Sequence, residues 1–470
     1  MFPLHTTEQI RAAEAAAYAT LPDGELMRRA AAGLARAVAE ELRGRGGGRV
    51  LVAAGPGNNG GDGLYAGALL AARGVPVTGW RTSDRVHEAG WAAFLAAGGR
   101  PVDAAAALAQ LPSTGLVLDA VYGMGARPGL PASVAAFADA CREQRVTVVS
   151  CDVPSGLDSD GAGSRDDVSF RADRTVSLGA WKIAHVAEPA RSRAGRLSLV
   201  KIGLALPAPG LVAWEVDDLA RIWPYPDASS DKYSRGVVGL DTGSHDYPGA
   251  GVLSAHGAVY AGAGMVRCLG PAHVSDLVRR DLPNVVGAEG RVQSWVLGSG
   301  WGERADAADR VRALLATGLP LVIDADALGQ LPGTPLGRAD VLLTPHAGEL
   351  ARLLGTGRAE IVADPVASVR AAAERLGACV LLKGATQYVA EPGGGHVTLA
   401  VAGPAWTAQA GSGDVLAGIC GTLLAAGLRA AEAALAGASV QAITAAANPG
   451  PYPPQEIARR LPAVIAGLRR

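Results

Sequence analysis

Hydrophobic and polar positions alternate in two different ways along this chain. Residues 7–43 carry apolar side chains every three to four positions, which predicts helices that begin at Thr6 or Thr7 and end before Gly44. After them, short β-type runs alternate with helical segments that end in glycine. The clearest runs are RVLVAA (49–54), GLVLDAV (115–121), VTVVSCDV (146–153), RTVSL (174–178) and LSLVKI (197–202). This alternation predicts an α/β fold with a parallel sheet, in which ligands bind at the carboxyl ends of the strands.

The pattern is interrupted between about Gly203 and Arg235, where proline and turn-forming residues are frequent. A second α/β series follows. Its predicted strands include SWVLG (294–298), LPLVID (319–324) and ACVLLK (378–383), and QYVAE and HVTLA are predicted to form a hairpin. We therefore expect two domains, residues 1–213 and 214–470.

The composition narrows the class of protein. Hydrophobic residues make up 49% of the chain and charged residues 19%, which is typical of a globular protein. The 43 basic residues nearly balance the 44 acidic ones, so we expect a small-molecule substrate and neither a nucleic acid nor a membrane as partner. The first residues do not resemble a secretion signal, and five cysteines are scattered without paired spacing. These features predict buried, reduced thiols and a cytoplasmic location.

The first candidate site is the glycine-rich loop GPGNNGGDG (55–63), which follows a predicted strand and opens a helix. Glycines let the backbone turn tightly and bring its N–H groups against a phosphate at the positive end of a helix. A plain tight turn would also use glycine. However, Asn58, Asn59 and Asp62 place three polar side chains in this loop, and a simple turn does not require them.

Two acidic loops follow later strands. Asp119 precedes AVYGMGARPG, and Asp152 lies in CDVPSGLDSDG; both stand at the carboxyl end of a predicted strand beside a glycine-rich turn. The three loops are therefore expected to meet at one edge of the sheet. Asn59, Asp119 and Ser155 offer oxygen ligands, which suit a hard cation such as K⁺ or Mg²⁺ and not zinc. The alternative is that each residue only caps a helix or forms a turn.

In the second half, Gly411-Ser-Gly-Asp414 opens an apolar run with helical spacing. Backbone N–H groups at such a helix start can hold a phosphate, while Asp414 acts as a base or orients a nucleophilic hydroxyl. This is phosphoryl-transfer chemistry without a Walker A sequence, although an aspartate that only caps the helix would show the same pattern. Asp324, Asp326, His346 and Glu349 follow two other strands, and Lys383, one of four lysines, stands beside a glycine turn.

The motifs GPGNNGGDG, DAVYGMG and DVPSGLD together resemble the NAD(P)H-hydrate epimerase domain, over about residues 1–205. The resemblance implies a Rossmann-like fold, the damaged cofactors NADHX and NADPHX as substrates, and a bound K⁺. It further implies that K⁺ is held by Asn59, Asp119 and Ser155. The implied hydrate contacts are Asn58, Asn59, Gly60, Gly61, Asp62, Gly123, Met124, Gly125, Ala126, Arg127, Pro128, Gly129 and Asp152.

Epimerisation of the hydrate needs a group that helps water or a proton to leave and return. Asp152 is the candidate general acid or base, because a carboxylate in this loop is expected to be partly desolvated by the ligand. Lys182, in SLGAWKIAH after the next β-type run, is the second catalytic candidate. Its alternative interpretation is a solvated lysine at the end of a strand.

The motifs DADAL, LTPHAGE, LLKGA and GSGD together resemble the ADP-dependent NAD(P)H-hydrate dehydratase, a branch of the ribokinase-like fold, over about residues 215–470. The resemblance implies that Asp414 activates the ring hydroxyl of the S hydrate to attack the β-phosphoryl group of ADP, with Mg²⁺ on the phosphates. The implied hydrate contacts are Ala250, Gly300, His346 and Asp414. The implied nucleotide contacts are Lys383, Gly384, Ala385, Thr386, Gln387 and Gly413.

One position departs from the family pattern, because Ala410 stands where a glycine is usual before Gly411. If the backbone there required a positive φ, alanine would cost about 1 kcal/mol or more. If it did not, the change would be harmless.

The two halves together indicate a bifunctional enzyme that interconverts the R and S hydrates and dehydrates the S form to NAD(P)H, while ADP becomes AMP and phosphate. The residues alone leave ADP against ATP open, and the resemblance favours ADP. Two alternatives remain at this stage: a ribokinase-like small-molecule kinase with an appended nucleotide-binding domain, and a non-catalytic nucleotide-binding protein. The alanine-rich helices suit packing within one subunit or between subunits of a homo-oligomer.

Overall fold

The computed structural model describes residues 1–44, 46–161, 168–331, 333, 336, 338 and 340–469. The chain divides into two compact units, Pro3–Pro209 and a second unit formed by Met1–Phe2 with Gly210–Arg470. The division falls a few residues before the boundary expected from the sequence after Ala213. Strand β9 (Leu211–Ala213) pairs with β17 (Val397–Leu399), so it belongs to the sheet of the second unit.

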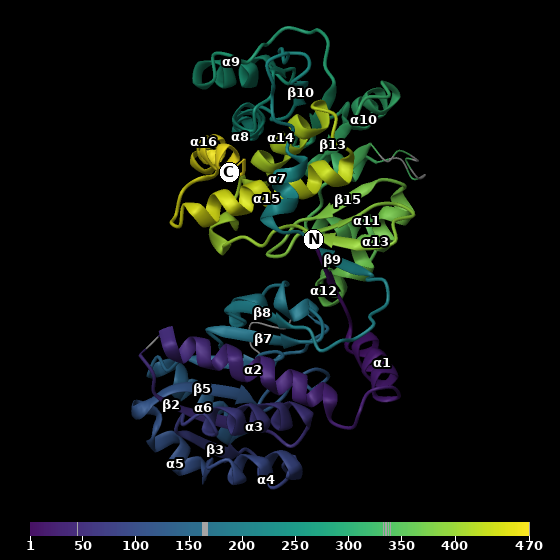
Figure 1. Ribbon diagram of the computed structural model, residues 1–470. Helices are drawn as coiled ribbons and strands as arrows, with labels where there is room; N and C mark the ends of the chain where they lie inside the picture. The colour runs from purple at the N-terminus through teal and green to yellow at the C-terminus, as the bar shows by residue number, and fades with distance from the viewer. Residues whose placement is uncertain are drawn as a thin grey trace. The chain divides into compact units, whose positions relative to one another are not determined.

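The unit Pro3–Pro209 contains a seven-stranded, fully parallel sheet in the order β4-β3-β2-β5-β6-β7-β8 (Figure 1). The strand order reverses direction between β2 and β5, and a crevice opens at such a point above the carboxyl ends of the strands. The strands are β2 (Arg49–Ala54), β3 (Val77–Arg81), β4 (Arg100–Val102), β5 (Thr114–Ala120), β6 (Val148–Cys151), β7 (Arg174–Leu178) and β8 (Arg196–Val200). The predicted parallel α/β sheet is therefore confirmed.

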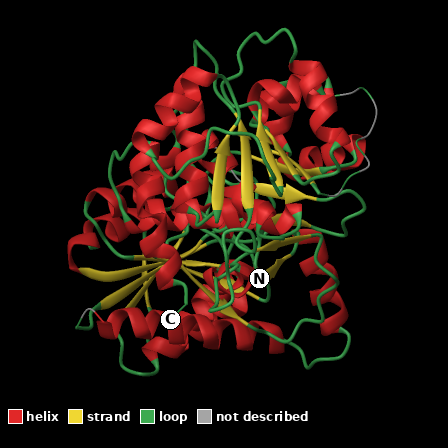
Figure 2. Ribbon diagram, turned by 90° about the horizontal axis from the view of Figure 1, so that it is seen from above, coloured by secondary structure: helices red, strands yellow, loops and turns green. Residues whose placement is uncertain are grey.

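Helices lie beside the strands of the sheets (Figure 2), and two apolar clusters show that helices pack on both faces of this sheet. Successive side chains of β2 point to opposite faces, so Val50 and Val52 pack with α2 and α3, whereas Leu51 and Ala53 pack with Phe137 of α6. Thr6 caps the first helix in a capping box with Gln9, as the sequence allowed. The helices are α1 (Thr7–Tyr18), α2 (Glu25–Gly44), α3 (Asn58–Ala71), α4 (Glu88–Ala96), α5 (Ala104–Ala109) and α6 (Ala132–Glu143).

The second unit is built on a ten-stranded sheet in the order β1-β9-β17-β16-β15-β14-β13-β12-β10-β11. The strands from β11 to β15 are parallel, and β16 and β17 form the predicted antiparallel hairpin. The strands are β1 (Phe2–Leu4), β9, β10 (Val237–Asp241), β11 (Met265–Cys268), β12 (Ser294–Leu297), β13 (Leu321–Ile323), β14 (Val341–Leu343), β15 (Cys379–Leu382), β16 (Tyr388–Ala390) and β17.

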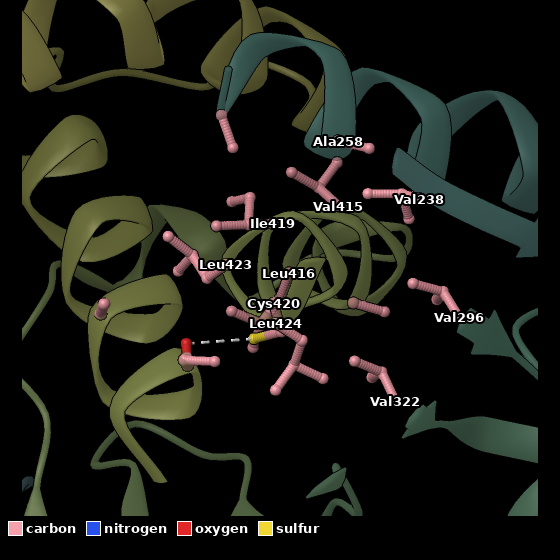
Figure 3. Packing of buried hydrophobic residues seen from close by; sticks show 14 of the residues in the cluster. Val238, Ala258, Val296, Val322, Val415, Leu416, Ile419, Cys420, Leu423 and Leu424 are labelled. Atoms are coloured by element: carbon pink, nitrogen blue, oxygen red, sulfur yellow. Dashed lines mark hydrogen bonds between the residues drawn. The ribbon is translucent and has the colours of Figure 1, made fainter. Parts of the chain in front are cut away.

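Helix α14 (Ser412–Ala425) is the central helix of this unit (Figure 3). Val415 lies toward Ala258 of α8, and Leu424 lies toward Val296 and Val322 of the sheet. Apolar contacts surround this helix from Val415 onward. The other helices are α7 (Val216–Ile222), α8 (Pro248–Tyr260), α9 (Ala272–Asp281), α10 (Ala307–Ala316), α11 (Ala347–Leu354), α12 (Arg358–Ala363), α13 (Pro365–Leu376), α15 (Ala430–Ala447) and α16 (Pro454–Gly467).

Within the described part of the chain, α15 alone has the length and apolar composition needed to cross a membrane, and 78% of it is buried. It packs against α14, α16 and β15, so its position in the core accounts for its composition. All five cysteines are free and buried, which confirms the expectation for the thiols.

Two candidate active sites

The first site lies at the carboxyl ends of β2, β5, β6 and β7, and its centre is the fully buried carboxylate of Asp119. Asp119 accepts hydrogen bonds from the hydroxyls of Ser150 at 2.7 Å and Ser155 at 2.5 Å, and from the N–H of Ser155 at 2.9 Å. Burial raises the pKa of Asp119 to about 6, although these hydrogen bonds oppose the rise. Ser155 also accepts from the N–H of Tyr122 at 2.8 Å, so one serine joins the loops after β5 and β6.

Asn59 brings the glycine-rich loop to the same place. A Cβ on Gly123 would stand 2.6 Å from the Asn59 side-chain oxygen, so these two residues are in close contact. The Asn59 amide nitrogen is buried and has no hydrogen-bond partner among the described residues. Among the described residues, no basic side chain forms an ion pair with Asp119. This corner therefore combines a buried, uncompensated carboxylate with hydroxyl and amide groups.

Asp152 follows β6 and has a φ of 68°, in the left-handed region that is rare for non-glycine residues. Its Oδ1 accepts from the Lys182 ammonium at 2.5 Å and from the N–H of Leu178 at 3.1 Å. Among the described residues, the one hydrogen bond to its Oδ2 is long, 3.3 Å from the N–H of Met124. This second oxygen therefore remains the less committed one and lies toward the Gly123–Gly129 loop.

Lys182 is fully buried, in contrast to a solvated lysine at the end of a strand. Besides Asp152, its ammonium donates to the carbonyl oxygens of Leu178 at 3.1 Å and Ala180 at 3.0 Å. The three N–H donors of this ammonium therefore all have acceptors within the protein, which is the arrangement that a buried charge requires.

His185 supports the same pair and was not predicted from the sequence. The N–H of Lys182 donates to His185 Nδ1 at 3.1 Å, so the ring proton is on Nε2, which donates to the carbonyl oxygen of Asp152 at 2.7 Å. Burial and the nearby Lys182 charge lower the pKa of His185 to about 4, so the ring is neutral. The neutral ring fixes the backbone of Asp152 at its unusual φ.

Two further carboxyl groups face this pair. Burial and the charges of Asp152 and Glu14 raise the pKa of Asp62 well above its usual range. Burial and the charge of Asp152 likewise raise the pKa of Glu14 in α1. The site therefore combines a carboxylate paired with Lys182 and a second carboxyl group, that of Asp62, whose pKa is raised by burial and by the neighbouring acidic charges.

Helix α1 covers this edge of the sheet. The Thr7 hydroxyl lies 2.9 Å from the Ser159 hydroxyl, and Arg11 donates to the carbonyl oxygen of Met124 at 3.5 Å. Thr7, Arg11 and Glu14 stand at helical spacing and lie on one face of α1.

The other predicted hydrate contacts are distributed unevenly. Asn58 is exposed at the start of α3, while Gly60 and Gly61 are buried: a Cβ would stand 2.0 Å from the Gly55 carbonyl oxygen or 2.9 Å from the His87 ring. These two glycines therefore allow close packing of α3 on its own loop. The loop Gly123–Gly129 stays partly open, with Gly125, Arg127 and Pro128 exposed and Met124 and Ala126 half-buried. Gly129 is joined to the Asp152 loop by a hydrogen bond of 2.9 Å to the carbonyl oxygen of Gly156.

The second site lies at the carboxyl ends of β12 to β15. An ion pair between Asp324 and Lys383 lies at its bottom. Asp324 is buried and accepts from the Lys383 ammonium at 2.5 Å, the Thr344 hydroxyl at 2.8 Å and the Ser299 hydroxyl at 2.9 Å. Burial acts to lower the pKa of Lys383, but the attraction of Asp324 and Glu349 outweighs it and the pKa is raised. Lys383 is therefore a firmly charged group, and its side chain remains 17% exposed.

Asp414 stands in the first turn of α14 and is only half-buried. Burial and the charge of Asp324 raise the pKa of Asp414 to about 7, while Lys383 opposes the rise. A Cβ on Gly413 would stand 3.3 Å from the Lys383 ammonium, so the lysine lies against the start of α14. A base matched to neutral pH and a cation thus meet at the positive end of a helix.

Ala250 and Gly300 are in close contact beside Ser299, whose hydroxyl donates to Asp324. Gly300 has a φ of 67°, and a Cβ on it would stand 2.4 Å from the Cβ of Ala250 in α8. Only glycine satisfies both the backbone conformation and the contact. The structure thus brings together two residues that are separated by about fifty positions in the sequence.

His346 caps α11 through Nδ1, which accepts from the N–H groups of Gly348 at 3.0 Å and Glu349 at 3.2 Å. The ring is exposed, and its Nε2 lies 3.5 Å from Oε1 of Glu349. His346 also forms a backbone bridge with Lys383, so the two residues lie on neighbouring strand ends. His346 can therefore cap α11 and stand beside Lys383 at the same time.

The predicted nucleotide loop Gly384–Gln387 follows Lys383. Gly384 and Ala385 are exposed, Thr386 and Gln387 are half-buried, and the Gln387 amide oxygen is buried without a hydrogen-bond partner among the described residues. The backbone question at position 410 has a clear answer. The positive φ, 90°, belongs to Gly411, and Ala410 is not among the non-glycine residues with positive φ. The alanine therefore causes no strain.

Comparison with known proteins now decides the family. Residues 23–184 match the family described as YjeF-related protein N-terminus, and residues 238–463 match the family described as NAD(P)H-hydrate dehydratase. The chain is 43% identical to the bifunctional NAD(P)H-hydrate repair enzyme Nnr of Mycobacterium tuberculosis, over 92% of this chain and 90% of that one. The chain belongs to the bifunctional NAD(P)H-hydrate repair enzymes. The enzyme Nnr of Mycobacterium leprae is 44% identical over 95% of both chains.

Solved structures agree with this assignment for the fold. An ADP/ATP-dependent NAD(P)H-hydrate dehydratase of Bacillus subtilis, co-crystallised with ATP/Mg²⁺, has a TM-score of 0.51 at 24% identity and covers 55% of this chain and 98% of its own. A ribokinase-like superfamily protein of Enterococcus faecalis has a TM-score of 0.50 at 21% identity and covers 56% of this chain and 98% of its own. The predicted ribokinase-like fold of the second half is confirmed.

Membership in the NAD(P)H-hydrate repair family confirms the predicted pairing of an epimerase domain with a dehydratase domain. It excludes the two alternatives kept open by the sequence, a small-molecule kinase with an added domain and a non-catalytic nucleotide-binding protein. The predicted motifs fall into two clusters, one in each unit. Sequence reasoning missed Glu14 and His185, which show their role only through the fold.

Proposed function

We propose that the Pro3–Pro209 unit epimerises NADHX and NADPHX and that the second unit dehydrates the S form to NAD(P)H, with ADP converted to AMP and phosphate. The observation that carries the proposal is Asp414, a half-buried carboxyl group with a pKa raised to about 7 beside Lys383 at the start of α14. Such a group is half ionised near neutral pH, which suits a general base. We place the enzyme in the cytoplasm, since its five cysteines are free.

In the dehydratase site, Asp414 takes the proton from the ring hydroxyl of the hydrate, and the hydroxyl oxygen attacks the β-phosphorus of ADP, releasing AMP. Phosphate then leaves the ring carbon, a proton leaves the neighbouring carbon, and the reduced ring is restored. Lys383, Gly413 and the loop Gly384–Gln387 hold the nucleotide, where ammonium and backbone N–H groups offset phosphate charge. Ala250, Gly300 and His346 bound the space for the nicotinamide ring.

Mg²⁺ would neutralise the nucleotide phosphates, and it would be held chiefly by those phosphates. Among the described residues, no group of three or more His, Cys, Asp or Glu side chains is placed to hold a metal ion. This fits Mg²⁺, which commonly binds through substrate phosphates and one or two carboxylates. Asp324 and Asp326 are the carboxylates whose charges raise the pKa of Asp414.

In the epimerase site, the ring C–O bond breaks and forms again on the other face. We assign the proton donor for the departing hydroxyl to Asp62, whose pKa burial raises, and the proton acceptor for the returning water to Oδ2 of Asp152, which accepts only one long hydrogen bond among the described residues. Lys182 is too deeply buried to touch the substrate, so we assign it as a positioning residue that holds the Asp152 carboxylate. Neutral His185 fixes the backbone of Asp152 in the same way.

K⁺ fits the corner formed by Asn59, Asp119 and Ser155, because the Asp119 charge is buried without a basic partner in the described chain. A monovalent cation would compensate that charge and hold the loops after β2, β5 and β6 together. All three residues supply oxygen atoms, as a hard cation requires.

The proposal is tested by incubating the purified chain with both epimers of NADHX, Mg²⁺, K⁺ and either ADP or ATP. The absorbance of the reduced nicotinamide reports recovery. We expect complete recovery of both epimers with ADP, and slower recovery of the R epimer when Na⁺ replaces K⁺. Recovery of the S epimer alone, beyond the slow spontaneous exchange, would contradict the epimerase assignment. No recovery with either nucleotide would contradict the dehydratase assignment.

A further inference from the structure

A cavity of about 580 Å³ lies at the carboxyl ends of β3 and β4, outside the residues used above. Its lining includes Trp80, Arg81, Trp91 and Asp84. In the sheet register, Arg81 stands directly beside Ala54, the residue that precedes the glycine-rich loop. Thr82 strengthens this link, because its N–H and its hydroxyl both donate to the carbonyl oxygen of Ala54, at 3.0 and 3.1 Å. The cavity therefore begins one strand away from the hydrate loop.

The chemistry of the cavity suits a purine nucleotide. The Arg81 guanidinium lies over the Trp91 ring at 5.5 Å, and Trp91 itself stacks on Phe94 at 5.5 Å. Trp80 forms a buried floor and contacts Phe137 at 5.0 Å. These contacts hold the two indole rings in fixed positions. The exposed Arg81 guanidinium offers a planar stacking surface for a purine base, and it also binds phosphate through two parallel hydrogen bonds.

Arg81 is available for such a ligand. It is exposed at the end of its strand and takes part in none of the ion pairs formed within the described chain. Asp103, another acidic residue of the lining, is already engaged as the cap of α5, where its side chain accepts from the N–H of Ala106 at 2.8 Å. Asp84 is the remaining carboxylate, and it lies three residues beyond Arg81.

The position of Arg81 in the fold identifies the part of the ligand it would meet. Strand β2, helix α3 and strand β3 form a strand–helix–strand unit that begins with the glycine-rich loop. In dinucleotide-binding folds, the end of the second strand approaches the adenosine ribose, and an acidic residue there binds the 2′-hydroxyl whereas an arginine accommodates a 2′-phosphate. Here the second strand ends in Arg81.

We propose that this cavity binds the adenosine half of the hydrated dinucleotide and that Arg81 contacts its 2′-phosphate, so that the epimerase unit prefers NADPHX to NADHX. The inference rests on the proposed epimerase function and assigns it a substrate preference. Asp84 should weaken this preference, because a carboxylate near the ribose repels the 2′-phosphate.

The first test measures kcat/KM for epimerisation of each hydrate by the full chain without nucleotide, using chromatographic separation of the R and S forms. We expect a preference of about tenfold for NADPHX, a typical effect of one charge-assisted contact. Arg81→Gln should bring the ratio close to one through KM, with kcat little changed. Asp84→Asn should increase the ratio. Arg85→Gln, an exposed arginine of the same loop that does not line the cavity, should leave it unchanged.

A second measurement separates failure of this inference from failure of the proposed function. Adenosine 2′,5′-bisphosphate and AMP are titrated calorimetrically into the full chain, with the dehydratase site saturated by ADP and Mg²⁺. The 2′-phosphorylated nucleotide should bind about tenfold more tightly, and Arg81→Gln should abolish the difference. Equal binding of both nucleotides, or a difference that survives Arg81→Gln, overturns the inference even if epimerisation is observed. A binding difference that depends on Arg81 supports it even if no epimerisation is found.

Discussion

In the Pro3–Pro209 unit, Lys182 is fully buried and its ammonium is bound to Asp152 and two carbonyl oxygens, whereas Lys383 in the second unit keeps 17% of its side chain exposed beside the start of α14. Both lysines hold an aspartate at 2.5 Å. In the mechanism proposed for the first site, the lysine holds the reacting carboxylate, so it acts only through Asp152. In the mechanism proposed for the second site, Lys383 holds Asp324 and Asp414 is the base. On this proposal, the same kind of ion pair serves positioning in one site and ligand binding in the other.

The largest effect on activity is expected at Asp414, the proposed general base. Asp414→Asn removes the proton acceptor while it preserves the size of the side chain, so dehydration should fall by about 10³-fold or more. Epimerisation should be unchanged, because the residues assigned to it lie in the other unit. The two rates are measured separately, one by recovery of reduced nicotinamide from the S hydrate and one by chromatography of the epimers. Retained dehydration would remove the role assigned to Asp414.

Replacement of the two lysines should lower the free energy of unfolding by different amounts. Lys182→Met leaves the buried charge of Asp152 unpaired and should lower the free energy of unfolding of its unit by about 3–5 kcal/mol. Lys383→Met should cost less, because Asp324 keeps the hydroxyls of Thr344 and Ser299, but it should raise the KM for ADP. Calorimetric unfolding compares both with Lys201→Met, at an exposed position. Equal losses of stability for Lys182 and Lys383 would contradict the comparison.

Gly300→Ala tests the close contact between Gly300 and Ala250. The new Cβ would meet Ala250 at 2.4 Å and force a positive φ on alanine, so we expect a loss of about 1–3 kcal/mol in stability and a higher KM for the hydrate. Gly249→Ala in α8 is the matched control, since nothing lies within 4 Å of its Cβ position. It should leave both quantities unchanged. A harmless Gly300→Ala would show that this contact is not close-packed.

The raised pKa of Asp414 predicts opposite effects of pH on activity and on stability. Dehydration should fall as the pH drops below about 7, because the base becomes protonated. A carboxyl group with a raised pKa in the folded state favours folding most at low pH, and this contribution is lost as the pH rises through the folded value. Asp414→Asn should therefore raise the melting temperature at pH 8 by a few degrees and leave it nearly unchanged at pH 4. A lower melting temperature at pH 8 would contradict the assignment.

The smallest effect is expected at Ala410. Because the positive φ belongs to Gly411, Ala410→Gly relieves no strain and should leave the KM for ADP within about twofold of the natural value, with a slight loss of stability from added backbone freedom. The measurement is steady-state kinetics with ADP varied. A marked gain in affinity would mean that alanine does hinder the phosphate loop.

The sequence predicted the sheets well, because strands such as RVLVAA and RTVSL are apolar runs bounded by turns, and β2 and β7 match their predicted ends. It also predicted Asp119, Asp152 and Asp414 as strand-end or helix-start carboxylates. It did not predict the environment of Lys182, since full burial depends on loops that meet only in the folded chain. Glu14 and His185 were missed for the same reason: each stands in a segment without a motif, and each reaches Asp152 through tertiary packing.

The central claim is that one chain holds two independent sites, one that depends on Asp152 and one that depends on Asp414. The most direct test mixes two full-length variants, Asp152→Asn and Asp414→Asn, with pure R hydrate, ADP, Mg²⁺ and K⁺. Asparagine tolerates the positive φ at position 152, and circular dichroism confirms folding. We predict that neither variant alone recovers NADH from the R hydrate faster than spontaneous exchange allows, and that the mixture recovers it completely. Failure of the folded mixture, or rapid recovery by either variant alone, would contradict the claim.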